Sequence, residues 1–306
     1  MSTPTRKTVK DFDPEVLRLF DQYVHGMIDR RGFLSSAARF AVGATTAAGL
    51  LAALTPQFAL GQQVKPDDAR LTTRYLEFAS PKGYDSGRGY LARPAGTAGS
   101  LPVVLVVHEN RGLNPHIEDV ARRLALEGYI AFAPDALFPL GGYPGEEDKA
   151  RELFAKLDQA KTKEDFLAAA RMLGDLDGAS GRLGVVGFCY GGGIANFLAT
   201  QVPELSAAVP FYGRAPAIEN VPAIKAELLI VMAANDERTN ADWPAYEAAL
   251  KKAKTRYAMF QPAGTEHGFN NDTTPRYDEG AATEAWKRML ALFERTLKGS
   301  AARTSG

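Results

Sequence analysis

Residues 183–200 read LGVVGFCYGGGIANFLAT and carry the strongest local signal in the chain. The apolar run that ends at Phe188 is typical of a β-strand, and the residues after Gly191 follow a helical pattern. Gly187 and Gly191 flank Cys189, as required where a strand turns into a helix so sharply that bulky neighbours do not fit. The stretch therefore predicts a strand, a nucleophile elbow and a helix, with Cys189 at the carboxyl edge of a sheet.

Cys189 is the one cysteine of the 306 residues, so an intramolecular disulfide and a cysteine-rich metal site are excluded. The first amides of the following helix would point at its sulfur and stabilise a thiolate, and later an oxyanion. A lone cysteine can also be an inert apolar filler of a core. The flanking glycines favour a nucleophile instead.

A nucleophilic thiol needs a base, and the base needs an acid that orients it. His267 lies in a glycine-flanked loop between the last predicted strand and the last predicted helix, and Asp236 directly follows an apolar strand. Glu237 and Glu266 are the competing carboxylates. The chain order of nucleophile, acid and histidine is that of the α/β-hydrolase fold.

The rest of the chain from residue 71 onward alternates strands and helices. Residues 101–108 (LPVVLVVH) form a continuous β-branched run, which is typical of a central parallel strand covered on both faces. We therefore predict an α/β protein with the α/β-hydrolase fold, in which a mostly parallel central sheet is flanked by helices on both faces. The predicted strands cover residues 72–79, 89–93, 101–108, 129–134, 184–188, 207–212, 228–233 and 257–261, and the predicted helices cover 115–127, 146–157, 163–173, 191–200, 243–252 and 279–297.

The loop after residues 101–108 completes the predicted site. It reads HENRG over residues 108–112, where this fold places one amide of its oxyanion hole. We assign the backbone N–H groups of Asn110 and Tyr190 to that role.

Four motifs in the same order resemble the dienelactone hydrolase family over about residues 72–297: the elbow G-x-C-x-G-G, the loop H-E-N-R-G, the acid after a strand and the histidine loop E-H-G-F. The resemblance implies a triad of Cys189, His267 and Asp236, and a glutamate, Glu109, that contacts the thiol in the resting enzyme. It implies a carboxymethylenebutenolidase-like enzyme that cleaves a small ester or lactone through an acyl-enzyme, without a metal or cofactor. The alternatives are a hydrolase of the same fold for another acyl substrate, and a non-catalytic exported binding protein.

The chain departs from the family at the two arginines that grip the substrate carboxylate, which align near Pro139 and Asn271. A guanidinium fork suits a carboxylate, so other arginines are candidates, although each is equally open to a structural ion pair. Two aromatic residues are candidates for the acyl pocket, with core packing as the alternative. The substrate-binding candidates are Arg111, Arg214, Tyr143 and Phe269.

The first 61 residues differ in character from the body. Arg30 and Arg31 are followed by Phe-Leu and then by residues 40–64, which carry no charge. This pattern resembles a twin-arginine export signal, so we divide the chain into a leader (1–61) and a hydrolase domain (62–306) and expect export to the periplasm through that machinery. The alternatives are an uncleaved membrane anchor, a helix packed on the body and a cytoplasmic protein. A helix-like pattern over residues 11–28 is unusually long and mixed in charge for the start of a signal.

Charge and composition exclude other classes. The chain has 36 basic and 36 acidic residues and no basic stripe with interleaved aromatics, so nucleic acid is not an expected partner. The four histidines show no H-E-x-x-H spacing that would support a metal site. A small molecule is the expected partner, and the sequence makes no prediction of the oligomeric state.

Overall fold

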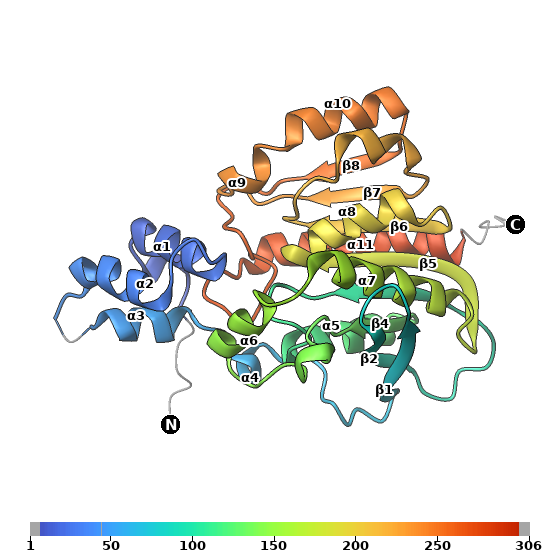
Figure 1. The fold of residues 1–306 in the computed structure, drawn as a ribbon, viewed down its shortest axis with the longest axis horizontal. Helices are drawn as coiled ribbons and strands as arrows, with labels where there is room; N and C mark the ends of the chain where they lie inside the picture. The colour runs from blue at the N-terminus through green and yellow to red at the C-terminus, as the bar shows by residue number, and fades with distance from the viewer. Residues whose placement is uncertain (1–6, 44, 300–306) are drawn as a thin grey trace, which may run out of the picture.

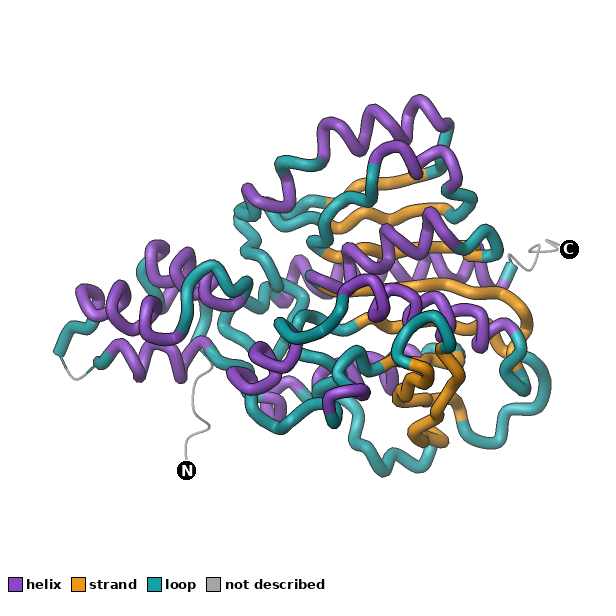
Figure 2. Tube along the Cα trace, viewed as in Figure 1, coloured by secondary structure: helices purple, strands orange, loops and turns teal. Residues whose placement is uncertain are grey.

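The computed structural model describes residues 7–43 and 45–299, so residues 1–6 and 44 of the predicted leader and residues 300–306 of the predicted body lie outside it. Its centre is an 8-stranded sheet with the strand order β1-β2-β4-β3-β5-β6-β7-β8 (Figures 1 and 2). The pairs β1–β2 and β2–β4 are antiparallel and the other pairs are parallel. The predicted fold class is confirmed. The strands are β1 (Leu71–Ser80), β2 (Asp85–Pro94), β3 (Leu101–Val107), β4 (Ile130–Pro134), β5 (Ala179–Phe188), β6 (Leu205–Phe211), β7 (Glu227–Val231) and β8 (Tyr257–Phe260).

Helices cover both faces of this sheet, which explains the continuous apolar run of β3. Val103 and Val107 pack into the core beneath α7, α8 and α10, while Val104 and Val106 pack into the core beneath α5 and α11. All four are at most 1% exposed, so both faces of the strand are buried. The helices and helical turns of the body are α5 (Pro115–Leu126), η3 (Phe138–Leu140), α6 (Glu147–Phe154), α7 (Gln159–Gly174), α8 (Tyr190–Gln201), η4 (Ile218–Ala223), α9 (Glu237–Asn240), α10 (Trp243–Ala253), α11 (Glu279–Phe293) and η5 (Glu294–Lys298).

The described residues between 9 and 54 fold into a small helix cluster with a core of its own, here called the N-terminal helical unit (residues 9–43 and 45–54). Asp13 caps its first long helix and Pro14 opens it, and Asp29 caps the helix that begins at Arg30. Figure 1 shows the unit in blue at one end of the sheet. Its elements are η1 (Val9–Asp11), α1 (Pro14–Val24), α2 (Arg30–Ala37), η2 (Ala38–Phe40) and α3 (Ala47–Leu54), and the short α4 (Phe58–Gly61) leads on to the body. Its buried apolar residues are Phe12, Val16, Leu17, Leu19, Phe20, Tyr23, Phe33, Ala37, Leu51 and Leu54.

The arginine pair of the predicted export signal therefore stands at the start of a folded helix, α2. Among the residues that the structure describes, no helix is both long enough and apolar enough to cross a membrane. Export itself, and the boundary drawn at residue 61, stay predictions.

Candidate active site

Cys189 occupies the sharp turn between β5 and α8. Its backbone has φ 55° and ψ −111°, a conformation that residues other than glycine rarely adopt. A Cβ at Gly187 would lie 1.9 Å from the carbonyl oxygen of Gly191, and a Cβ at Gly191 would lie 2.2 Å from the carbonyl oxygen of Val107. Only glycine fits at these two positions, because neighbouring backbone atoms lie too close for a Cβ. The turn holds the cysteine at the carboxyl edge of the sheet.

The structure brings His267 and Asp236 to the same edge. Asp236 follows β7 and His267 follows β8, and the His267 Nδ1–H donates to Asp236 Oδ2 at 2.5 Å. The backbone N–H of Thr239 holds the other carboxylate oxygen at 3.2 Å. Because Nδ1 is bound to the carboxylate, the imidazole presents Nε2 to the site.

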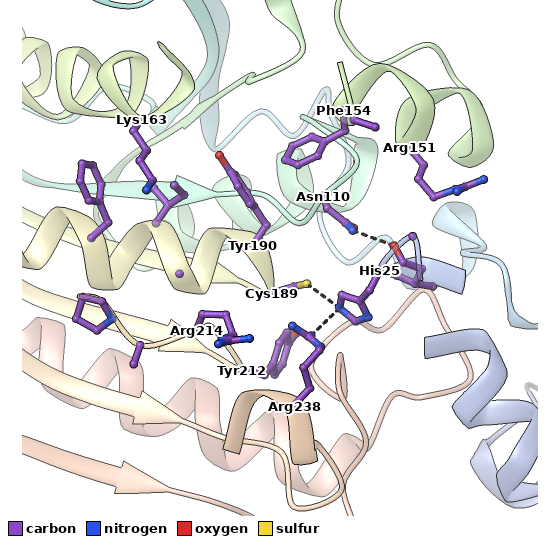
Figure 3. A pocket seen from close by; sticks show the side chains of 18 of the residues that line it. His25, Asn110, Arg151, Phe154, Lys163, Cys189, Tyr190, Tyr212, Arg214 and Arg238 are labelled. Carbon is purple, nitrogen blue, oxygen red and sulfur yellow. Dashed lines mark hydrogen bonds between the residues drawn. The ribbon is translucent and has the colours of Figure 1, made fainter. Parts of the chain in front are cut away.

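A second imidazole faces the sulfur, and it comes from the N-terminal helical unit. His25 follows the last residue of α1, and its Nε2 lies 3.6 Å from Cys189 Sγ (Figure 3). Its ring stands edge-on to that of His267, with 4.7 Å between the ring centres. Sγ and one ring nitrogen from each histidine all lie within 4.8 Å of one another.

The two neighbouring imidazoles determine the protonation state of the Cys189 thiol. Burial acts to raise the pKa of the Cys189 thiol, but the charge of His267 and the hydrogen bond from His25 outweigh burial and lower that pKa to about 5. Burial acts to lower the pKa of His267, but the Cys189 thiolate and the bond to Asp236 raise it to about 10. At neutral pH the site therefore rests as a thiolate beside an imidazolium.

A cavity of about 980 Å³ opens beside the sulfur. Cys189, Tyr190, Asn110 and Arg214 line it, and the exposed Arg214 pairs with Asp242 at 2.5 Å. The size suits a small organic ligand. Tyr190 is the first residue of α8, so its amide belongs to the helix end that has no intrahelical acceptor. Among the lining residues for which the sequence gave no sign are Val24, His25, Arg151, Lys163 and Arg238.

Glu109, which the resemblance places against the thiol, has another partner. Its Oε2 accepts a hydrogen bond from Asn271 Nδ2 at 3.1 Å, whereas His25 Nε2 lies 3.6 Å from the sulfur. Asn271 stands where the family is expected to carry an arginine. Asn271 thus binds Glu109 from this position.

Three of the four substrate-binding candidates also have other roles. Arg111 is buried, lies 3.6 Å from Glu147 and donates to the carbonyl oxygen of Asn110 at 3.0 Å. The Tyr143 hydroxyl donates to Glu147 at 2.9 Å, and Phe269 is fully buried against Tyr212. In the described part of the chain these side chains hold the walls of the site, and Arg214 is the candidate that reaches the cavity.

Thiolate and imidazole are also ligands of Zn²⁺, so Cys189, His25 and His267 form the one set among the described residues with the ligand types and spacing for a metal. The sequence gave no spacing that pointed to it, because the three residues come from three distant segments. Arg238 Nη2 lies 2.9 Å from His25 Nε2 and places a positive charge beside the ligand atom. That charge favours an anion, such as the thiolate, over a cation at this position.

Comparison with known proteins agrees with the geometry. The dienelactone hydrolase family matches residues 88–297, and the YqhI-like family matches residues 3–42. The chain is 53% identical over 113 residues to a "Putative hydrolase fragment YghX" of Escherichia coli K12, which covers 37% of this chain and 97% of that protein. It is 34% identical over 231 residues to a "Putative carboxymethylenebutenolidase" of Salmonella typhi, which covers 70% of this chain and 84% of that protein. The crystal structure of a "Putative Dienelactone Hydrolase" from Klebsiella pneumoniae superimposes with a TM-score of 0.65 at 30% identity, covering 73% of this chain and 99% of that one.

A mostly parallel sheet sandwiched by helices, with a cysteine on a strained turn after its central strand, defines an α/β-hydrolase. Within that class the chain belongs to the dienelactone hydrolase family, and it is a hydrolase of esters or lactones.

Sequence reasoning missed His25 and the carboxylate behind it, Asp21. One signal pointed toward them. The amphipathic pattern over residues 11–28 is too long and too mixed in charge to open an export signal, and it corresponds to α1, whose end carries His25.

Proposed function

We propose that this enzyme cleaves a small ester or lactone through attack by Cys189 and an acyl-thioester intermediate. The observation that carries the proposal is the strained turn at Cys189, with φ 55°, beside a histidine whose Nδ1 is bound to Asp236 at 2.5 Å. A nucleophile, a base and an orienting acid in that arrangement are the requirements of acyl transfer.

The steps follow from the charges at rest. The Cys189 thiolate attacks the carbonyl carbon, and the amides of Tyr190 and Asn110 hold the resulting oxyanion. The leaving oxygen takes the proton from His267 Nε2 as its bond to carbon breaks. Water then attacks the thioester and gives a proton to the same nitrogen. The C–S bond breaks, the electron pair returns to sulfur and the acid is released.

The cavity indicates which substrates fit. The single carboxylate in its lining is that of Glu152, and the positive charges there are those of Arg151, Lys156, Lys163, Arg214 and Arg238. We infer a substrate that carries an acidic group, as the name of the carboxymethylenebutenolidase relatives also suggests. Arg214 and Arg238 take the place of the family's absent arginines in this proposal.

Mass spectrometry of the intact protein during turnover tests the proposal. Mixing with dienelactone and with activated esters is expected to add one acyl group, which peptide mapping places on Cys189. Iodoacetamide is expected to abolish turnover in step with alkylation of this one thiol. Turnover that continues after complete alkylation would contradict a cysteine nucleophile.

We also propose that the protein is exported in folded form, with Arg30 and Arg31 as the recognition pair. Both arginines are exposed at the start of α2. Replacing both by lysine should hold the protein in the cytoplasm of a bacterium that has a twin-arginine pathway, whereas the unaltered protein should reach the periplasm. If the variant and the unaltered protein are distributed between cytoplasm and periplasm in the same proportion, this route is contradicted.

A further inference from the structure

His25 is held beside Cys189 by a carboxylate of its own helix. Its Nδ1 lies 2.8 Å from the carbonyl oxygen of Asp21 and 3.2 Å from the Asp21 carboxylate. The pair of Asp21 and His25 thus repeats, beside the same sulfur, the pair of Asp236 and His267. Two carboxylate-bound imidazoles turn a ring nitrogen toward the same thiol.

Arg238 completes this arrangement from α9. Its Nη2 donates to His25 Nε2 when the ring is neutral, and the ring itself donates Nε2–H to the sulfur when it is charged. The charged ring therefore places both a positive charge and an N–H donor next to Sγ, whereas beside the neutral ring the positive charge is that of Arg238. This is the environment that stabilises a thiolate.

The N-terminal helical unit forms a wall of the cavity and leaves it open. Val24, His25 and Gly26 line one side of the 980 Å³ space, and Cys189 and Tyr190 line another. Figure 3 shows the His25 ring pointing at the sulfur from the side opposite Tyr190. A substrate placed against Cys189 would therefore also meet His25.

Contacts on several elements fix the unit to the body. Asn110 Nδ2 donates to the carbonyl oxygen of Val24 at 2.9 Å, immediately before His25. Arg30 pairs with Asp148 at 2.8 Å, and the Tyr23 hydroxyl binds the same carboxylate. Further contacts are the guanidinium of Arg151 over the Tyr23 ring at 4.7 Å, that of Arg276 over the Phe20 ring at 5.2 Å, and the ion pair of Arg276 with Asp21 at 3.8 Å.

We propose that the N-terminal helical unit is a permanent part of the working enzyme and that His25 is a further catalytic residue, which stabilises the Cys189 thiolate. The inference rests on Cys189 being the nucleophile. It goes beyond the family resemblance, because the family match begins at residue 88 and His25 lies in the separately matched segment 3–42.

The role of His25 leaves the proton balance of the reaction unchanged. During attack the sulfur gives its electron pair to the new S–C bond and its negative charge passes to the carbonyl oxygen. During hydrolysis of the thioester the S–C bond breaks and the charge returns to the sulfur, where His25 stabilises it again. His267 alone gives and takes the proton, and His25 keeps its own protons throughout.

The test is the pH dependence of iodoacetamide alkylation in the full-length protein, compared with His25→Ala. The groups that face this part of the site are Asp21, Glu109, Arg111, Arg238, His267 and Arg276, and all of them stay in the variant. Loss of one hydrogen bond to a charged sulfur is expected to raise the alkylation midpoint by about one pH unit and to lower kcat/KM about tenfold or more. Free imidazole should restore part of the loss.

Controls separate this role from a structural one. Met27→Ala removes a neighbouring side chain that is 55% exposed and should leave both quantities unchanged. Asp21→Asn keeps the ring and weakens its partner, so it should shift the midpoint in the same direction by a smaller amount. Thermal unfolding of each variant verifies that the fold is kept.

The outcomes are distinct for the two proposals. If His25→Ala has the same alkylation midpoint and the same kcat/KM as the active wild-type protein, the role of His25 is overturned and the cysteine nucleophile still stands. A wild-type protein that neither hydrolyses any ester nor reacts with iodoacetamide would overturn both.

Discussion

Cys189 and His25 face each other from two regions of the molecule that differ in the size of their hydrophobic cores, the central sheet and the N-terminal helical unit. Cys189 follows the central strand β5 of an 8-stranded sheet whose two faces are both buried. His25 ends one helix of a small cluster that has a separate core and meets the body mainly through polar contacts. A small core stabilises less, so the unit should open more readily than the sheet. We therefore expect that the helical unit with His25 can be loosened without unfolding the sheet that holds Cys189, the proposed nucleophile.

The largest effect on activity is expected from a change at Cys189, which the central sheet holds. Cys189→Ala should lower hydrolysis by about 10⁴-fold or more, because the reaction loses its nucleophile. The thermal midpoint should hardly move, since the change removes one atom at a turn already fixed by its glycines. Steady-state kinetics and calorimetry measure the two quantities.

Cys189→Ser is the matched control for this change. The serine hydroxyl stays protonated where the site favours a thiolate, so acylation should be slow even with the geometry kept. Full activity of the serine variant would contradict the account of an activated thiolate.

The next largest effect is expected from the core of the N-terminal helical unit. Phe33 is fully buried there and packs edge-on against Phe20 at 6.3 Å. Phe33→Ala should destabilise the unit by about 3–5 kcal/mol and should lower kcat/KM to the level of His25→Ala. Hydrogen exchange should show lost protection in α1–α3 and unchanged protection in the sheet. Lost protection with full activity would mean that the unit is not needed for catalysis.

The pH dependence of kcat/KM tests the proposed ion pair of Cys189 and His267. The pKa of Cys189 is lowered to about 5, so the thiolate is present above that pH and is lost as the pH falls through it. The pKa of His267 is raised to about 10, so the imidazolium is lost as the pH rises through that value. We expect kcat/KM to be flat near neutrality and to fall about tenfold per unit below pH 5. An acid limb centred near the free-thiol pKa of about 8.5 would contradict the ion pair.

The smallest effect is expected at the rim of the cavity. Arg214 is 58% exposed and its pair with Asp242 is open to solvent, so Arg214→Ala should change stability by at most about 1 kcal/mol. The KM for an ester with a carboxylate should rise by up to about fivefold, with no change for a neutral ester of the same size. An equal rise for both esters would argue against a carboxylate clamp.

The fold could be predicted because its signals are local. The run over β3, the glycines around Cys189 and the order of Asp236 and His267 each depend on backbone geometry within a few residues. These features predicted the sheet and brought three candidate residues to one edge, where the structure has them.

The parts that could not be predicted depend on contacts between distant segments. His25 and Cys189 are 164 positions apart, and nothing next to His25 shows that its helix packs on the body. The hydrogen bond from Asn271 to Glu109 joins residues that are 162 positions apart, and it likewise becomes visible only when the two loops are seen together. The half-buried position of Tyr143 and the buried position of Phe269 follow from packing, which the sequence pattern does not specify.

The most direct test of the account is to titrate the Cys189 thiolate by its ultraviolet absorbance in the full-length protein and in His25→Ala, with Cys189→Ala as the blank. The chain has one cysteine, so the signal belongs to this residue alone. We expect an apparent pKa near 5 in the wild-type protein and a clearly higher value in the variant. The same apparent pKa in both proteins would contradict the claim that the two regions form one active site.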